Sequence, residues 1–197
     1  MKITEYLKLS EVTEKRFHVG YQLSPLQAET LHHVLGLVGE LRELEEALFE
    51  NDTVNVKEEV GDTLWYAAGL CRLYNVSEDA INDCVKYLEE HGGQKNLLDS
   101  LGFLYHHLVD MYKREFVYGQ YHSFSQWNSL ACEVFATVVL SCGVKYSKNS
   151  LPFTVEDAME TNIKKLESRF GHEFDAYRAL NRDLDVEREI LDNSMRS

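Results

Sequence analysis

Helical periodicity runs through almost the whole chain, and only two prolines, Pro25 and Pro152, interrupt it. Apolar residues recur at intervals of three and four, which is typical of amphipathic helices. No segment alternates regularly enough to indicate a strand. We expect helices at residues 3–16, 26–50, 56–74, 77–91, 96–117, 126–143, 155–170 and 183–192. A chain of 197 residues with this pattern predicts a single all-α domain over 1–197, folded as an antiparallel helix bundle.

Local signals indicate where these helices begin and which faces they bury. Asn55 followed by Glu58 resembles a capping box, which predicts a loop over NDTVN and a helix that begins near Val56. Ser77 is predicted to cap the next helix. The buried face of helix 26–50 is predicted to consist of Val34, Leu35, Val38, Leu41, Leu44 and Leu48.

Four carboxylates form two matched pairs on consecutive predicted helices. Glu40 and Glu43 lie three residues apart in GELRE, and Glu59 and Asp62 lie three residues apart in EEVGD. Residues at this spacing share one face of a helix. Two helices that turn such pairs inward bring four carboxylates together, and buried carboxylates must bind cations or be protonated. Oxygen ligands favour Mg²⁺ or Mn²⁺, and Mg²⁺ held in this way usually contacts substrate phosphates.

The charge distribution agrees with such a site without requiring it. The formal net charge is −13, and residues 38–62 contain nine acidic and two basic residues. A cation site and a solvated acidic face would both produce this local excess. The chain has no basic stripe for nucleic acid and no apolar run of about 18 residues for a membrane span. The first 15 residues lack the apolar core of a signal peptide, so we expect a reducing compartment and buried free thiols at Cys71, Cys84, Cys132 and Cys142.

The chain also shows an internal repeat. SEDAINDCVKYL (77–88) matches VEDAMETNIKKL (155–166) with a shift of 78 positions. Upstream, Leu35-Gly36 recurs as Leu101-Gly102, and 63–71 faintly resembles 133–142. Two amphipathic helices could match in this way by chance. The alternative is a duplicated three-helix unit, with copies at about 31–91 and 97–171, a GGQKN linker, and 172–197 as a C-terminal extension.

The two predicted copies carry complementary chemistry. The acidic set is absent from the second copy, which has instead His106, His107, Val109, Cys132 and Glu133 in the corresponding regions. Its last helix places three polar residues on one face, at spacings of three and seven: Asn162, Lys165 and Arg169. The first copy has Cys84 and Tyr87 at the first two of these places. One copy would then bind metal and the other would bind phosphate, giving one site per chain.

These motifs resemble the MazG-like, all-α nucleoside triphosphate pyrophosphohydrolases. The signature of that family is ExxE, a spacer, and ExxD, which here reads Glu40-Leu-Arg-Glu43, fifteen residues, and Glu59-Val-Gly-Asp62. LHHVLGLVGELRE and VKEEVGDTLWYAAGL look like the two metal helices of the small, often phage-encoded members. NIKKLESRF followed by NRD looks like their C-terminal element. The resemblance covers about 21–91 and 155–183, and about 65 additional residues separate its two parts.

The resemblance implies hydrolysis of a (deoxy)nucleoside triphosphate to a nucleoside monophosphate and pyrophosphate. Glu40, Glu43, Glu59 and Asp62 would bind two or three Mg²⁺ ions, which would lower the pKa of an attacking water and hold phosphate oxygens. Lys165 and Arg169 would neutralise the pyrophosphate, and Asn162 would bind a phosphate oxygen or a metal-bound water. Family members are usually dimers or tetramers, whereas the repeat predicts a monomer (a pseudo-dimer) or a homodimer. The expected location is the cytoplasm, or the host cytoplasm if the gene is phage-encoded.

Several residues have both a functional and a structural interpretation. Trp65 lies three residues after Asp62 and could stack on a base or pack in the core. His32 could contact substrate or lie between helices, and Tyr21-Gln22 fits the entry segment of small family members. Lys165 and Arg169 could instead face solvent, paired with Glu167 or Glu173, and Asn162 could make a structural contact. Glu45, Glu46, Glu50 and Glu58 are predicted to be surface acids.

Other functions remain as alternatives at this point. A non-catalytic nucleotide-binding or regulatory module would keep the fold without turnover, although it has no need of all four carboxylates. A ferritin-like di-iron bundle needs Glu-x-x-His on two helices, and the chain has one such motif, Glu29 to His32. A purely structural helical protein would not gain thermal stability from Mg²⁺ and nucleotide.

Overall fold

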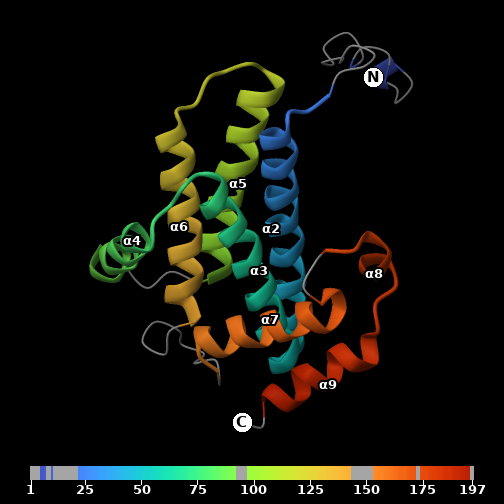
Figure 1. Cartoon of the computed structure of the whole chain (residues 1–197). Coiled ribbons are helices and arrows are strands. Elements are labelled where there is room, and N and C mark those ends of the chain that lie inside the picture. Colours follow the sequence, from blue (N-terminus) through green and yellow to red (C-terminus); the bar gives the residue numbers. More distant parts are fainter. Residues whose placement is uncertain are drawn as a thin grey trace.

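Four long helices form an antiparallel bundle (Figure 1). The computed structural model describes residues 5–7, 10, 22–91, 97–142, 153–171 and 174–195. The bundle helices are α2 (Pro25–Glu50), α3 (Thr53–Leu73), α5 (Leu97–Tyr112) and α6 (Phe124–Cys142). A π-helical segment, Lys113–Val117, follows α5. All regular structure in the described residues is helical, which confirms the all-α fold.

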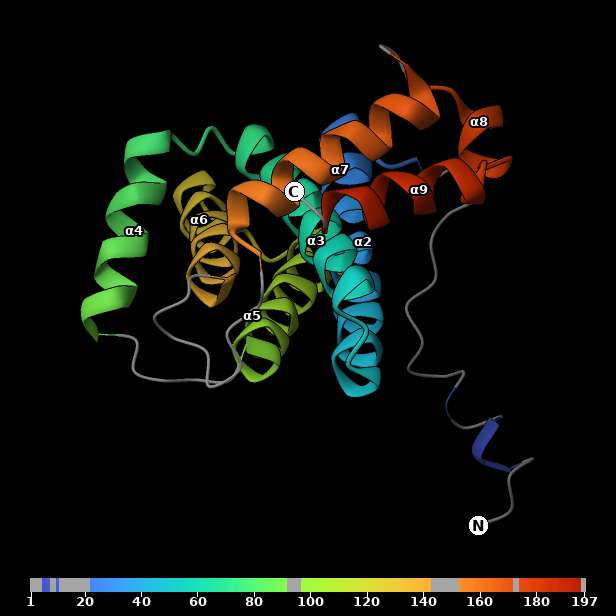
Figure 2. The same ribbon diagram turned by 90° about the horizontal axis from the view of Figure 1, so that it is seen from below.

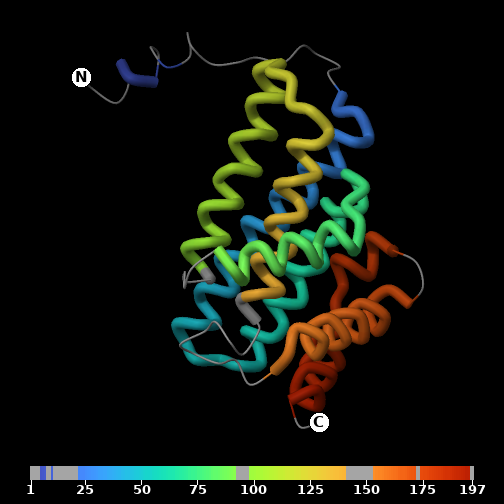
Figure 3. Tube along the Cα trace, turned by 90° about the vertical axis from the view of Figure 1, so that its left-hand side faces the viewer, coloured from blue at the N-terminus to red at the C-terminus, as the bar shows by residue number. Residues whose placement is uncertain are grey.

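The remaining helices pack on the outside of this bundle. α4 (Glu78–His91) lies against α6, and α7 (Val155–Phe170) lies across α3 (Figure 2). α9 (Leu184–Ser194) packs along α7, after the short helix α8 (Ala176–Leu180). Figure 3 shows α7 and α9 toward the end of the bundle opposite the α5–α6 connection. No helix in the described ranges is long and apolar enough to cross a membrane.

Side-chain caps fix the beginnings of the helices that position the site. Ser24 and Gln27 form a capping box before α2, with Pro25 in the first turn. α2 ends at Asn51, which has a φ of 56° in the left-handed region. Thr154 and Asp157 form a second capping box at the start of α7. These caps explain why the predicted helices 26–50 and 155–170 agree with the structure to within one residue.

Other predicted boundaries need correction. α3 begins at Thr53, three residues before the predicted start, because the Asp52 side chain accepts a hydrogen bond from the Asn55 backbone N–H at 3.2 Å. The predicted Asn55–Glu58 capping box is therefore wrong. Ser77 does accept from the Ala80 backbone N–H, as predicted. Helix α8 was not predicted. Most of the predicted helix 3–16, the GGQKN linker and Tyr21 lie outside the described residues, while Gln22 is exposed and precedes α2.

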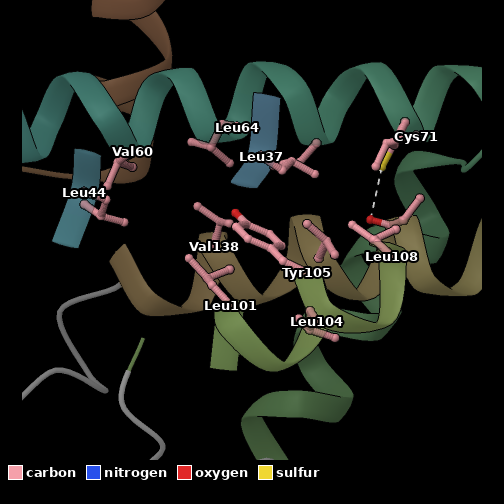
Figure 4. Packing of buried hydrophobic residues seen from close by; sticks show 14 of the residues in the cluster. Leu37, Leu44, Val60, Leu64, Cys71, Leu101, Leu104, Tyr105, Leu108 and Val138 are labelled. Carbon is pink, nitrogen blue, oxygen red and sulfur yellow. Dashed lines mark hydrogen bonds between the residues drawn. The ribbon is translucent and has the colours of Figure 1, made fainter. Parts of the chain in front are cut away.

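The core lies between α2, α3, α5 and α6 (Figure 4). Its side chains are mainly leucine, valine and alanine, and Tyr74 and Trp127 stack at 5.1 Å near one end. In helix α2 the predicted buried face is wrong by part of a turn. Leu35 and Val38 are 60% and 41% exposed, whereas Leu37, which was not predicted, is fully buried. Val34 and Leu44 are buried as predicted, and Leu41 and Leu48 pack at the edge of the core.

Gly61 allows α3 and α7 to approach each other closely. A Cβ atom at Gly61 would lie 2.8 Å from the Asn162 Cβ and 3.0 Å from the Ala158 carbonyl oxygen. The second of these is backbone, so α7 itself would have to move. Gly39, on α2, has nothing within 4 Å of such a Cβ. These two glycines therefore form a matched pair for mutation.

We expect Gly61→Ala to destabilise the protein by about 1–2 kcal/mol, because the helix-propensity gain does not compensate for displacing α7. Gly39→Ala should stabilise the protein by about 0.5–1 kcal/mol, because nothing opposes the same gain. Urea denaturation of both variants measures the difference. If both substitutions changed the free energy of unfolding equally, the close contact between α3 and α7 would not require glycine at position 61.

Candidate metal and nucleotide site

Three of the four predicted carboxylates converge between α2 and α3. Glu40 and Glu43 come from consecutive turns of α2, and Glu59 faces them from α3. One oxygen from each residue can be chosen so that all three lie within 4.8 Å of one another. Glu59 is 7% exposed, Glu40 is half-buried and Glu43 is exposed. The cluster therefore has a buried inner side and an open outer side.

The buried carboxyl group of Glu59 is not satisfied by protein alone. Among the described residues, its Oε2 atom has no hydrogen-bond partner. Burial, together with the hydrogen bond and charge of Glu40, raises the pKa of Glu59 to about 9. Burial and the charge of Asp62 also raise the pKa of Glu40, to about 7. In the protein without metal, both raised pKa values therefore favour the neutral, protonated carboxyl groups.

Asp62, the fourth predicted carboxylate, faces α7. Its Oδ1 accepts a hydrogen bond from Asn162 Nδ2 at 2.5 Å, and its Oδ2 accepts from Lys165 Nζ at 2.5 Å. Lys165 is 1% exposed and also donates to Glu58 at 3.0 Å. Burial would lower the pKa of Lys165, but the charges of Asp62 and Glu58 outweigh it and raise that pKa. The structure thus brings Asn162 and Lys165 to the carboxylates, over a sequence separation of about 100 residues.

The burial of Glu58 and the contacts of Arg169 differ from those predicted. Glu58 is not a surface acid, because its side chain is only 15% exposed and binds Lys165. Arg169 shares the face of Asn162 and Lys165, but its guanidinium binds both carboxylate oxygens of Glu187 on α9, at 2.8 and 2.6 Å. Hydrogen bonds from Arg169 and Arg182 overcome the effect of burial and lower the pKa of Glu187 to about 2. Arg169 therefore anchors α9 to α7 in this structure.

An aromatic cluster lies on the same two helices as the carboxylates. The rings of His32 and Trp65 are 6.3 Å apart in an edge arrangement, and Tyr66 lies 5.0 Å from Trp65 and 5.5 Å from His32. The Tyr66 ring occupies the space over Gly36, where a Cβ would come within 2.2 Å of it. Burial and the charges of Glu40 and Asp62 raise the pKa of Tyr66, which lies four residues after Asp62 on α3.

Sequence reasoning missed Glu58, Tyr66 and Glu187. Glu58 and Tyr66 lie four residues before and after Asp62, so they share its helix face, and that spacing could have identified both. Glu187 offered no comparable signal, because its partners Arg169 and Arg182 meet it only through the packing of α9 on α7.

The donor set suits a hard divalent cation. Three carboxylates supply only oxygen ligands, and the unpartnered Glu59 Oε2 is an acceptor buried without a donor. A cation would displace the protons from these carboxyl groups and balance the negative charge that burial disfavours. The residues therefore fit Mg²⁺ or Mn²⁺.

Residues 28–90 match the family model of the MazG nucleotide pyrophosphohydrolase domain. The resemblance predicted from the motifs is confirmed over these residues, which include most of α2, all of α3, most of α4 and all four carboxylates. The match indicates nucleotide pyrophosphohydrolase activity, and so a nucleotide substrate. It does not extend to α7, so the contribution of Asn162 and Lys165 depends on the structure. Neither the curated proteins nor the solved structures contain a match to the chain.

Mg²⁺ is expected to stabilise this MazG-like site more at high pH than at low pH. In the metal-free protein the pKa values of Glu59 and Glu40 are raised to about 9 and about 7, so at about pH 6 both carboxyl groups are protonated in the folded state. Metal binding must then release both protons. The stability that these raised pKa values contribute is complete below the unfolded pKa of 4.5 and falls as the pH rises toward the folded values. At about pH 8.5 Glu40 is ionised, so its share of that stability has been lost and metal binding no longer has to displace its proton.

Thermal melts in saturating Mg²⁺ and in EDTA, at these two pH values, measure this effect. The rise in melting temperature on adding Mg²⁺ should be clearly larger at about pH 8.5. A rise that is independent of pH would show that the cation does not bind through the protonated carboxyl groups.

Proposed function

We propose that the protein hydrolyses a (deoxy)nucleoside triphosphate to a nucleoside monophosphate and pyrophosphate in the presence of a divalent cation. The observation that carries this proposal is the convergence of Glu40, Glu43 and the unpartnered, buried Glu59 within the residues that match the MazG domain. A protein that only bound a nucleotide would have no need to maintain this buried acidic cluster, which is unfavourable without metal.

Glu40, Glu43, Glu59 and Asp62 would hold two or three Mg²⁺ ions. Bound cations of this kind polarise phosphate oxygens and increase the acidity of water. Asp62 contributes through its position, since Lys165 and Asn162 orient both of its oxygens. Lys165 also brings a buried positive charge next to the carboxylates, where a phosphate chain would need neutralisation. Arg169 would reach the phosphates only by releasing Glu187.

The aromatic cluster supports a place for the nucleobase. Trp65 and Tyr66 are half-buried, and His32 is exposed beside them, so the cluster offers a ring surface that is partly open to a ligand. Because Trp65 and Tyr66 follow Asp62 by three and four residues on α3, a nucleotide with its phosphates at the carboxylates could place its base on these rings.

One chain supplies every group of this proposed site. The carboxylates come from α2 and α3, and Lys165 and Asn162 come from α7 of the same chain. We therefore expect activity to be a property of the monomer, with specific activity that does not change on dilution.

A pyrophosphate-release screen over the common NTPs and dNTPs, with Mg²⁺ and with EDTA, tests the function. Metal-dependent release by the wild type that is lost in a Glu59→Gln plus Asp62→Asn double variant would establish the enzyme and identify its base. No release from any nucleotide by folded protein, with Mn²⁺ also tried, would favour the non-catalytic nucleotide-binding module. Thermal shifts with the same nucleotides would then identify its ligand.

A further inference from the structure

The packing of the helices is the same when the two predicted copies are exchanged. In the first copy α2 packs on α3, and in the second α5 packs on α6. The third helix of each copy packs on the second helix of the other: α4 lies on α6, and α7 lies on α3 (Figure 2). A duplicated unit that pairs with itself about a twofold axis would produce this exchange.

Two local contacts show which residues of the two predicted copies occupy equivalent positions. On α3, Gly61 lies against the Ala158 carbonyl and Asn162 of α7. On α6, the Cys132 thiol donates to the Ala80 carbonyl of α4 at 3.3 Å. Burial, together with the neighbouring Cys132 thiol, raises the pKa of Cys84 to about 12. Ala80 and Cys84 are the repeat partners of Ala158 and Asn162, so Cys132 is the partner of Gly61, with a shift of 71 positions.

The same shift relates α2 to α5. It pairs Thr30 with Leu101, Val34 with Tyr105, and Leu37 with Leu108, and all six side chains are buried. The pairing of Leu35 with Leu101 that the sequence suggested does not match in burial, because Leu35 is 60% exposed and Leu101 is 0% exposed. The shift of 71 therefore relates both pairs of bundle helices.

This register leads to a cavity at the position equivalent to the carboxylate cluster. Glu40 corresponds to Met111, Glu43 to Arg114, and Glu59 to Leu130. These three partners line one cavity of about 300 Å³ between α5 and α6, which is largely open to solvent. Met111 and Leu130 are apolar and Arg114 is a cation, so none of the three partners is a carboxylate.

The polar lining of the cavity consists of His107, Asp110, Arg114, His122 and Gln126, and Asp110 is its single carboxylate. Arg114 Nε donates to Asp110 at 2.5 Å, and Lys113 binds the same carboxylate at 3.2 Å. Within the described residues the terminal amino groups of Arg114 have no hydrogen-bond partner, and two cations share one carboxylate. The side chain of His122, which is 10% exposed, also lines the cavity, and its Nδ1 lies 3.4 Å from a Glu115 carboxylate oxygen without forming a hydrogen bond to any described residue. Arg114 lies in the π-helical segment, a distortion that is frequent at functional sites.

We propose that this second cavity binds a phosphate-bearing anion directly, without a divalent cation. Arg114 would bind the phosphate through its free amino groups, with His122 and Gln126 as further polar partners and Met111 and Leu130 as an apolar floor. The cavity is largely open to solvent, so a phosphate group can reach Arg114 from outside. That pyrophosphate and a nucleoside monophosphate are the natural ligands rests on the proposed function, and the site would then regulate the enzyme through its own products.

Isothermal titration calorimetry in EDTA tests the site separately from catalysis. The probes are inorganic pyrophosphate and the monophosphates of the nucleotides, each titrated into the wild type, Arg114→Gln and Arg42→Gln. Arg42 is the matched control, because it is an exposed arginine on α2 that also binds carboxylates at spacings of three and four. We expect Arg114→Gln to weaken binding about tenfold or more, and Arg42→Gln to leave it unchanged.

His122→Gln provides a second variant, with an expected weakening in the same direction. Equal affinity of the wild type and Arg114→Gln, or no binding of any probe by the wild type, would overturn the proposal. Binding of pyrophosphate alone would identify the inorganic product as the ligand, and binding of a monophosphate alone would identify the nucleotide. Because the titrations contain no cation and no triphosphate, their outcome does not depend on the hydrolysis assay.

Discussion

Replacing Glu59 with glutamine should lower pyrophosphate release by about a thousandfold without lowering the stability of the metal-free protein. The activity falls because glutamine cannot supply the negative charge that a divalent cation needs. Stability is retained because burial already raises the pKa of Glu59 to about 9, so the folded protein carries a neutral carboxyl group at neutral pH. The unfolded chain ionises at 4.5, so folding must take up a proton, and glutamine removes that requirement.

Glu45→Gln is the control for this experiment. Glu45 is 55% exposed and binds Arg42 on the surface of α2, so its replacement should change neither activity nor stability appreciably. Steady-state kinetics with Mg²⁺ and urea denaturation in EDTA give the two readouts. If Glu59→Gln retained more than about a tenth of the activity, Glu59 would not be a metal ligand. If it unfolded the metal-free protein, the carboxyl group would have a structural role that glutamine cannot fill.

The sequence predicted most of the fold because local chemistry sets the helix ends. Two capping boxes fix the starts of α2 and α7 regardless of tertiary packing. They are formed by Ser24 with Gln27 and by Thr154 with Asp157. The face that α2 buries was less predictable, since apolar residues lie on more than one side of this helix. Leu35 and Val38 are exposed because α3 and α5 approach α2 from the side of Val34 and Leu37.

The candidate site was predictable to the extent that it lies on single helix faces. Spacing alone placed Glu40 with Glu43, Glu59 with Asp62, and Asn162 with Lys165. Their meeting required the crossing of α7 over α3, which depends on Gly61 and could not be derived from either helix alone. The pairing of Arg169 with Glu187 could not be derived from single helices either, because it depends on how α9 packs on α7.

Replacing Lys165 with methionine should destabilise the metal-free protein by about 3–5 kcal/mol. The Lys165 side chain is 1% exposed and donates to both Glu58 and Asp62. Methionine fills the same space but leaves two part-buried carboxylates without their cation, beside a cluster that is already acidic. For a chain of this length the loss corresponds to a fall in melting temperature on the order of 10 °C.

The neighbouring Lys164→Met substitution makes this test specific. Lys164 is 64% exposed and lies 3.7 Å from Glu160, so its loss should change stability by no more than about 0.5 kcal/mol. Saturating Mg²⁺ should recover part of the loss in Lys165→Met, because a cation bound to Asp62 replaces some of the missing positive charge. Equal melting temperatures for the two variants in EDTA would show that Lys165 is not the group that balances the charge of the acidic site. If Mg²⁺ did not recover any of the melting temperature lost in Lys165→Met, the cation and Lys165 would act on different carboxylates.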